Sequence, residues 1–180
     1  MEQARIRESL ERASDALAQN PAMARSTAAP LTARLIDGLR LEVKGAGGET
    51  VCTDMPKMVG GEGSAPNPGW LMRASLAACT ASVIAMRAAR LGVRLTLLEV
   101  DAVSDTDNRR LLGLDDAAAS VLAVRLRVRI AAHGASDDAL REIAAWGEAH
   151  SPVACTLRMP PALSTEVEIL RQEFSDKMRG

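Results

Sequence analysis

The spacing of hydrophobic residues changes along the chain from a helical period to an alternating one and then back to a helical one. Residues 2–19 place apolar side chains at helical spacing and end at Asn20, which predicts an amphipathic N-terminal helix. Apolar and polar residues then alternate through 31–35, 39–43 and 50–53, with glycine-bearing turns between these segments. The start of the chain is therefore predicted to be a helix followed by a β-meander.

A long apolar segment follows a loop rich in glycine and proline. Asn67 is a suitable N-cap, Pro68 suits the first helical position, and Gly92 suits the end, so a helix is predicted over 68–91. Alanines recur along one side of this helix, and larger apolar residues together with Cys79 lie beside them. A helix that is apolar over most of its circumference is expected to be buried on most sides, and we predict that it is the central element.

The rest of the chain predicts a second group of strands and helices. Strict alternation predicts strands over 95–103 and 121–131, and helical spacing predicts a helix over 137–149. A short helix is predicted to follow and to carry Cys155 in its first turn, and an alternating segment over 165–170 is predicted to form a last strand. The predicted fold class is α+β, with an N-terminal β-meander, a long buried central helix, and a second antiparallel strand group with a second helix.

Three arginines, Arg125, Arg127 and Arg129, lie on one face of the strand predicted over 121–131. Acidic residues alternate in the strands predicted over 95–103 and 165–170, so cross-strand ion pairs can form. A solvated, salt-bridged face is favoured over a basic substrate groove. The formal net charge of −1 argues against a general nucleic-acid-binding protein, which needs an excess of positive charge.

The composition is that of one globular domain, with 47% hydrophobic and 25% charged residues but only 2% aromatic residues. Self-association is a natural way for such an alanine-rich chain to bury more apolar surface. The N-terminus is charged throughout, and arginines interrupt the apolar helix, so neither a secretory signal nor a membrane span is predicted. Three cysteines do not make a disulfide framework, and we expect a cytoplasmic protein without a cofactor or a metal site.

Cys79 and Cys155 are the residues most able to carry chemistry. A cysteine in the middle of an apolar helix is more often a packing residue than a reactive one. Two serines, Ser75 and Ser82, share the helix face of Cys79, however, so the surroundings are not purely hydrocarbon. Cys155 lies at a helix start, where backbone N–H groups and the helix dipole favour a thiolate, although it can also serve as a small packing residue.

Two motifs resemble those of the OsmC/Ohr family, the osmotically induced and organic hydroperoxide resistance proteins. The run GGEGSAPNPGWLMRASLAAC resembles the glycine loop, helix start and helix cysteine of that family, and HSPVACTLRMP resembles its second, Cys-Pro motif. The resemblance covers roughly residues 28–170. It implies an OsmC-like fold, in which residues 25–180 form one domain and residues 1–24 form an N-terminal helical extension.

The resemblance also implies an intertwined homodimer that reduces a small hydroperoxide. The helix cysteine of the family, here Cys79, attacks the peroxide and becomes a sulfenic acid, and a second cysteine resolves it to a disulfide that a dithiol reduces. This chain has Ser151 at the resolving position and Gly69 at the position of the glutamate of the family. Cys155 lies four residues after Ser151, on nearly the same helix face, and is the candidate resolving residue.

An arginine from the meander completes the site of the family, and Arg25 and Arg34 are the candidates for it here. The departures at Gly69 and Ser151 leave an alternative open, in which the chain keeps the fold but is catalytically weak or inactive. Such a protein would bind a small apolar ligand or act as a redox sensor. The presence of Cys79 with a nearby Cys155 favours the hydroperoxide reductase over this alternative.

Overall fold

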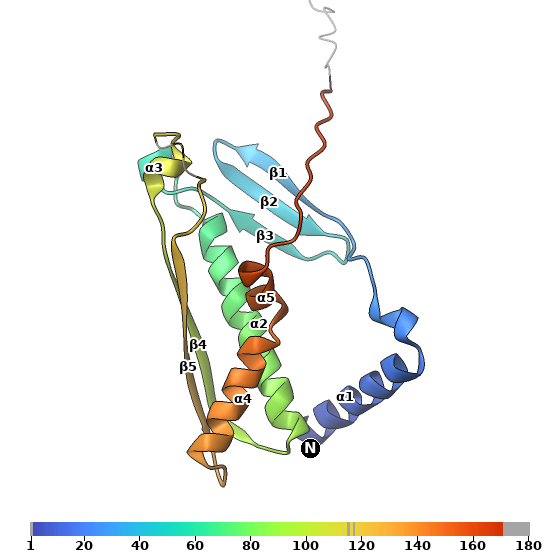
Figure 1. The fold of residues 1–180 in the computed structure, drawn as a ribbon. Coiled ribbons are helices and arrows are strands. Elements are labelled where there is room, and N and C mark those ends of the chain that lie inside the picture. Colours follow the sequence, from blue (N-terminus) through green and yellow to red (C-terminus); the bar gives the residue numbers. More distant parts are fainter. Residues whose placement is uncertain (1, 115, 117, 171–180) are drawn as a thin grey trace, which may run out of the picture.

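The computed structural model describes residues 2–114, 116 and 118–170, and its elements confirm the predicted α+β class (Figure 1). The elements follow one another in the order α1 (Glu2–Gln19), the 3₁₀ turn η1 (Pro21–Ala24), β1 (Leu31–Asp37), β2 (Arg40–Gly45), β3 (Thr50–Thr53), the 3₁₀ turn η2 (Lys57–Val59), α2 (Pro68–Arg90), β4 (Leu95–Asp105), α3 (Asn108–Leu111), β5 (Ala123–Ala132), α4 (Asp137–Ala149) and α5 (Pro152–Arg158).

The meander β1–β2–β3 is an antiparallel sheet with one apolar and one polar face. Gly38 takes a φ of 51° in the turn between β1 and β2, a conformation that glycine adopts without strain. Leu31 and Leu35 share one face of β1, because side chains two residues apart point the same way, and they are 69% and 62% exposed. The apolar face of the meander is therefore largely uncovered by the rest of this chain.

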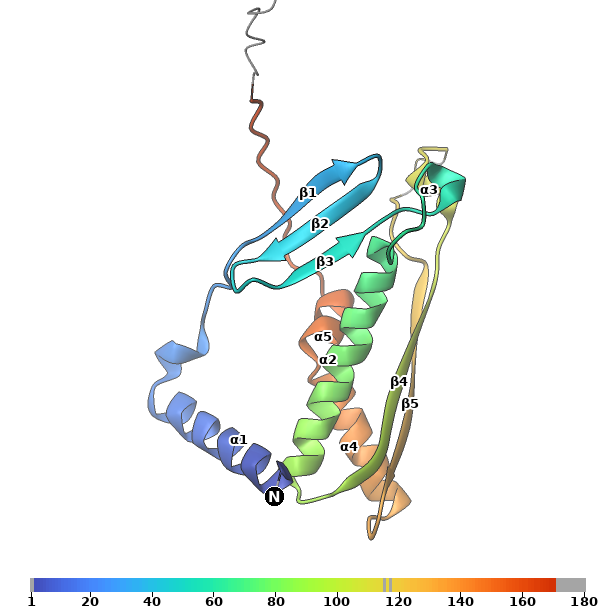
Figure 2. The ribbon, with the colours of Figure 1, turned by 180° about the vertical axis from the view of Figure 1, so that it is seen from behind.

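The helix α2 is the central element, as the sequence predicts (Figure 2). The side chain of Asn67 accepts a hydrogen bond from the Trp70 N–H at 2.8 Å and caps its start. Ile84 and Ala88 of α2 form a buried cluster with Ile143 of α4, and partly buried residues of β4 and β5 pack against this cluster. Among the described residues, only α2 has the length and composition to cross a membrane, and its contacts with β4, α4 and α5 place one side of it in the core of this fold.

The prediction that α2 is buried on most sides is wrong for the single chain. The hairpin β4–β5 and the helices α4 and α5 pack against one side, and α1 contacts the C-terminal end (Figure 2). Part of the circumference consequently stays uncovered although it is apolar or small. The exposed residues on this uncovered face of α2 are Ser75, Ala78, Ser82, Ala85 and Met86.

The charged face of the β4–β5 hairpin forms ion pairs, as predicted for its arginines. The Arg129 guanidinium lies 2.6 Å from a Glu99 oxygen and 3.1 Å from an Asp101 oxygen. The Arg125 guanidinium lies 2.5 Å from Asp105, and its hydrogen bond lowers the pKa of that carboxyl. All these groups are substantially exposed, so water and salt screen the pairs and they contribute little to stability.

The prediction of a last strand over 165–170 is wrong. Residues 159–170 form no strand or helix, and Leu163 and Ile169 are 93% and 83% exposed. Figure 1 shows this segment running from α5 away from the β4–β5 hairpin. A strand needs hydrogen-bond partners at a sheet edge, and none lies against the segment within the described part of the chain. Glu166 and Glu168 consequently do not form part of the charged face.

A compact loop after β3 fixes the start of α2. The buried Asp54 carboxylate accepts hydrogen bonds from the Ser64 N–H at 2.9 Å, the Ser64 hydroxyl at 2.8 Å and the Met55 N–H at 2.7 Å. The bond from the Ser64 N–H is the largest cause that lowers the pKa of Asp54. Gly61 leaves no room for a side chain, since a Cβ there would lie 1.9 Å from the Met55 carbonyl oxygen. The loop thus holds one conformation between the meander and α2.

The helix α4 touches the backbone of α2 at Gly147, and this contact gives a first prediction. A Cβ at position 147 would lie 2.4 Å from the Ile84 Cγ1 and 2.8 Å from its Cα. We expect Gly147→Ala to destabilise the protein by about 1–3 kcal/mol, since the helices must move apart. Urea unfolding measures the change. Gly69→Ala in the exposed first turn of α2 is the matched control, since a Cβ there would lie 3.3 Å from the Asn67 Oδ1 rather than against a backbone. It is expected to change stability much less, and equal effects of the two substitutions would contradict the packing argument.

The Asp54 network predicts a pH-dependent stability. A carboxyl group whose pKa is lowered by folding stabilises the folded state above its ordinary value of 3.8, and this contribution is lost as the pH falls through the folded-state pKa. We expect Asp54→Asn to lower the free energy of unfolding clearly at about pH 6 and much less at about pH 3. Denaturant titrations at both pH values measure this. If the difference in the free energy of unfolding between the wild type and Asp54→Asn did not change with pH, the charge of Asp54 would not be what stabilises the loop.

Candidate functional site

Cys79 lies in the third turn of α2, at the edge between the packed and the uncovered sides of the helix. Its side chain is half-buried, whereas its neighbour Thr80 is fully buried and faces α5. The exposed residues Ser75 and Ser82 lie on the other side of Cys79. The thiol is therefore next to the helix contact and also next to surface that this chain does not cover.

The contact between α2 and α5 is made by two hydroxyl groups. The Thr80 Oγ1 donates a hydrogen bond to the Ser151 Oγ at 3.2 Å, and both side chains are 0% exposed. The same Ser151 oxygen accepts the Ala154 N–H at 3.4 Å and caps α5. Position 151 therefore lies beside Thr80, the residue that follows Cys79. Sequence reasoning missed Thr80, although a polar residue among the apolar positions of the helix was a signal for such a contact.

Cys155 lies in the first turn of α5, as predicted. Its N–H donates to the Ser151 carbonyl at 2.9 Å, and its Sγ donates to the Ala149 carbonyl at 3.2 Å. Cys52, Cys79 and Cys155 are all half-buried free thiols. The structure thus brings α5, with Ser151 and Cys155, against the helix that carries Cys79.

The two helices also indicate on which side of their contact the thiols lie. Ala154 and Leu157 line a hollow against β5 and so mark the side of α5 that faces the sheet. Cys155 is one residue from Ala154, which turns its side chain about 100° around the helix, toward the opposite side. Cys79 is five residues from the core residue Ile84 and thus about 140° around α2 from it. Helix geometry thus turns Cys155 away from the hollow and Cys79 away from Ile84, while Cys79 stays about 60° around α2 from Leu76, which lines the hollow.

The two candidate arginines lie on the N-terminal part of the chain. Arg34 is on the polar face of the meander, in a cross-strand row with Glu42 and Cys52. Arg25 follows η1, and both arginines are exposed. In the described part of this chain no hydrogen bond joins either arginine to α2, so the single chain does not bring them to Cys79.

The first turn of α2 carries no acidic residue, because Gly69 stands at the position of the glutamate. A Cβ at this position would lie 3.8 Å from the Arg73 Nη1. The same Arg73 nitrogen donates to the Ser104 hydroxyl of β4 at 3.2 Å. The start of the central helix therefore presents a cation rather than a carboxylate.

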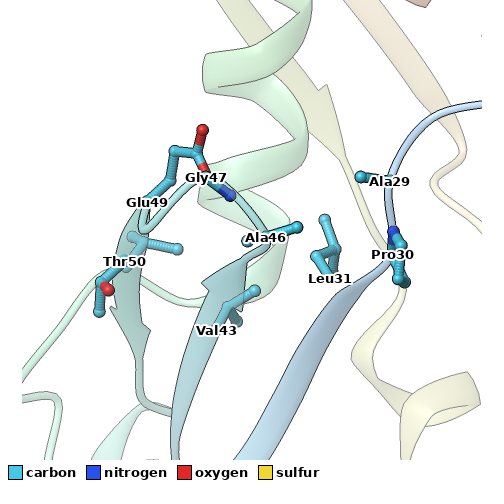
Figure 3. Close-up of a pocket in the computed structure, with 10 residues that line it drawn as sticks. Ala29, Pro30, Leu31, Val43, Ala46, Gly47, Glu49 and Thr50 are labelled. Atoms are coloured by element: carbon cyan, nitrogen blue, oxygen red, sulfur yellow. The ribbon is translucent and has the colours of Figure 1, made fainter.

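Two hollows lie outside the immediate surroundings of Cys79. One, of about 400 Å³, lies at the end of the meander, where Leu31, Val43 and Ala46 point toward one another (Figure 3). The Glu49 carboxylate at its rim accepts the Gly47 N–H at 3.1 Å, and no cysteine lines this hollow. The other, of about 540 Å³, lies between β5 and α5 and includes Leu76, three residues before Cys79. In the described residues no cluster of three His, Cys, Asp or Glu side chains has metal-binding geometry.

Comparison with known proteins places the chain in a family. A family model described as "OsmC-like protein" matches residues 61–166, which include α2, Cys79, Ser151 and Cys155. A search of curated proteins gives no match.

Several solved structures share the fold. The OsmC-like protein from Mycoplasma pneumoniae is 15% identical, with a TM-score of 0.64 over 76% of this chain and 91% of that chain. An organic hydroperoxide resistance protein OsmC from Legionella pneumophila is 21% identical, with a TM-score of 0.60 over 75% of this chain and 92% of that one. An organic hydroperoxide resistance protein from Elizabethkingia anophelis is 16% identical, with a TM-score of 0.56 over 76% and 91%. The match of the family model over most of the chain, together with this shared fold, shows that the chain belongs to the OsmC-like protein family.

Proposed function

We propose that the protein is a thiol-dependent hydroperoxide reductase with Cys79 as the peroxidatic residue. The observation that carries the proposal is the position of Cys79: a half-buried thiol on the central helix, beside the contact with the helix of the second family motif. The names of the solved relatives from Legionella pneumophila and Elizabethkingia anophelis support this class of reaction. Three free cysteines in one chain suit a reducing compartment, and we place the protein in the cytoplasm.

In the first step the Cys79 thiolate attacks one oxygen of the hydroperoxide. A sulfur–oxygen bond forms, the O–O bond breaks, and the leaving alkoxide takes a proton to become an alcohol. Cys79 is oxidised to a sulfenic acid and the hydroperoxide is reduced. Position 69 is a glycine, so no carboxylate assists this step. We therefore place Arg34 or Arg25 of a second copy of the chain near the thiolate as the cation.

Resolution requires a second thiol, which Ser151 does not supply. We propose that the Cys155 thiolate attacks the sulfenic sulfur of Cys79, so that a disulfide forms, the S–O bond breaks, and the leaving hydroxide takes up the proton that Cys155 has lost to become water. An external dithiol then restores both thiols by two exchange steps. The packing of α5, which carries Cys155, against α2, which carries Cys79, supports this pairing. A disulfide needs Cα atoms within about 7 Å, and the short helix α5 is the element that would adjust.

A homodimer is part of the proposal. The apolar face of the meander and the uncovered face of α2 are both exposed in one chain, and exposed apolar area of this kind marks an association surface. A second copy of the same chain offers matching apolar faces, and two-fold pairing would cover both at once.

A mass measurement tests the peroxide chemistry. The reduced protein is treated with one equivalent of an organic hydroperoxide and measured intact, beside Cys79→Ser and Cys155→Ser. We expect the wild type to lose two hydrogens within the mixing time, because Cys155 condenses with the sulfenic acid of Cys79. Cys155→Ser should instead gain one oxygen, and Cys79→Ser should not change.

The other outcomes are equally informative. A gain of one oxygen by the wild type would remove Cys155 as the resolving residue but keep Cys79 as the peroxidatic one, as in a one-cysteine enzyme or sensor. Peptide mapping that finds no link between Cys79 and Cys155 in a two-hydrogen product has the same consequence. If the mass of none of the three proteins changed, the reductase proposal would be contradicted and a ligand-binding protein would be favoured.

The homodimer is tested by the mass in solution. Size-exclusion chromatography with light scattering should give the mass of two chains for the wild type and a shift toward one chain for Leu35→Glu, since a buried charge would face the partner. Thr32→Glu on the opposite face of β1 is the matched control and should stay dimeric. A wild-type protein with the mass of one chain would contradict the proposal.

A further inference from the structure

The hollow between β5 and α5 is an open, mostly apolar depression that the thiol chemistry does not use. Its volume of about 540 Å³ lies in the range of small-molecule sites. Its apolar lining is formed by Leu76 of α2, Leu157 of α5 and, on the β5 side, Val121 to Val124, Leu126 and Val128. Cys79 is not among the residues that line it.

The walls of this hollow are held by contacts already described. The strand β5 is paired with β4 along its length, and α5 is anchored at its start by the buried Thr80–Ser151 hydrogen bond. The hollow is therefore preformed in the folded chain, and a ligand need not pay the entropy of ordering its walls.

A single ion pair marks the rim. The Arg158 Nη2 contacts the Glu148 Oε1, and both residues line the hollow. The Arg158 side chain is 50% exposed, and this pair engages one of its two terminal nitrogens. A guanidinium carries five N–H donors in a planar fork, so Arg158 can bind a second carboxylate next to Glu148.

An apolar interior with an ion pair at its edge, whose arginine has further N–H donors, can accept an amphiphile that has an acidic head. We propose that this hollow binds a medium-chain monocarboxylate, with the hydrocarbon chain between β5 and α5 and the carboxylate on Arg158. The hydrocarbon is removed from water, which favours binding in proportion to the apolar surface that is buried. The carboxylate gains charge-assisted hydrogen bonds that an alcohol of the same length does not. In the reduced protein, binding does not require the Cys79 thiol, which is not part of the lining.

The test compares octanoate with octan-1-ol by isothermal titration calorimetry on the reduced full-length protein. Because a hydrogen bond to a charged group contributes about 1.5–3 kcal/mol, we expect octanoate to bind at least about tenfold more tightly than the alcohol. Arg158→Gln should reduce this preference to less than about threefold while leaving the alcohol affinity nearly unchanged. Leu157→Glu, at a position 41% exposed, places a negative charge at the hollow and should weaken octanoate most.

Two controls separate this site from the rest of the molecule. Arg141→Gln changes an arginine on the exposed side of α4 and should leave both affinities as in the wild type. Cys79→Ser should also bind octanoate normally, so a failure of the reductase proposal does not affect this one. Absence of saturable octanoate binding, for example because a second copy fills the hollow, would overturn the proposal. A preference for octanoate that survives in Arg158→Gln would also overturn it.

Discussion

The close approach of α4 to α2 at Gly147 is the constraint on which the rest of the structure depends. Without a side chain at position 147, the backbone of α4 lies against Ile84, and this fixes the register between the two helices. Ser151 follows four residues later and meets Thr80, one turn before Ile84 on α2. The corner between α4 and α5 is therefore held at two points. The packing of α5 against α2 and the wall of the hollow against β5 both follow from these two contacts.

The sequence predicts most elements because their signals are local. An Asn or Ser cap with proline marks the starts of α2 and α5, and strict alternation marks the strands of the meander and of the β4–β5 hairpin. The segment 165–170 shows the limit of that reasoning. Its alternation is as regular as that of β5, but a strand exists only where a sheet edge accepts its hydrogen bonds, and a local pattern does not reveal where such an edge lies.

Part of the candidate site could also be predicted from the sequence, because some of its residues have local signals. Cys79, Ser151 and Cys155 could be named from motifs, since each lies at a recognisable helix position. The Thr80–Ser151 contact joins residues 71 positions apart, and only the packing of α5 on α2 reveals it. The burial of α2 was overestimated because an apolar circumference predicts that something covers the helix without saying which chain supplies the cover. The uncovered face bordering Cys79 is consistent with a site that one chain does not complete.

The serine at position 151 and the cysteine at 155 are best understood together. Ser151 is fully buried, accepts the Thr80 hydroxyl and caps α5, so it works as a structural residue; removing a buried partner of this kind costs about 1–3 kcal/mol. A resolving thiol must instead leave its partners to reach a sulfenic acid, and a residue that anchors a helix is poorly suited to that movement. Cys155 is half-buried, and its thiol makes one weak hydrogen bond to a carbonyl. Under the proposed mechanism, two residues one helical turn apart therefore have separate roles. Ser151 holds α5 against α2, and the Cys155 thiol moves to resolve the sulfenic acid.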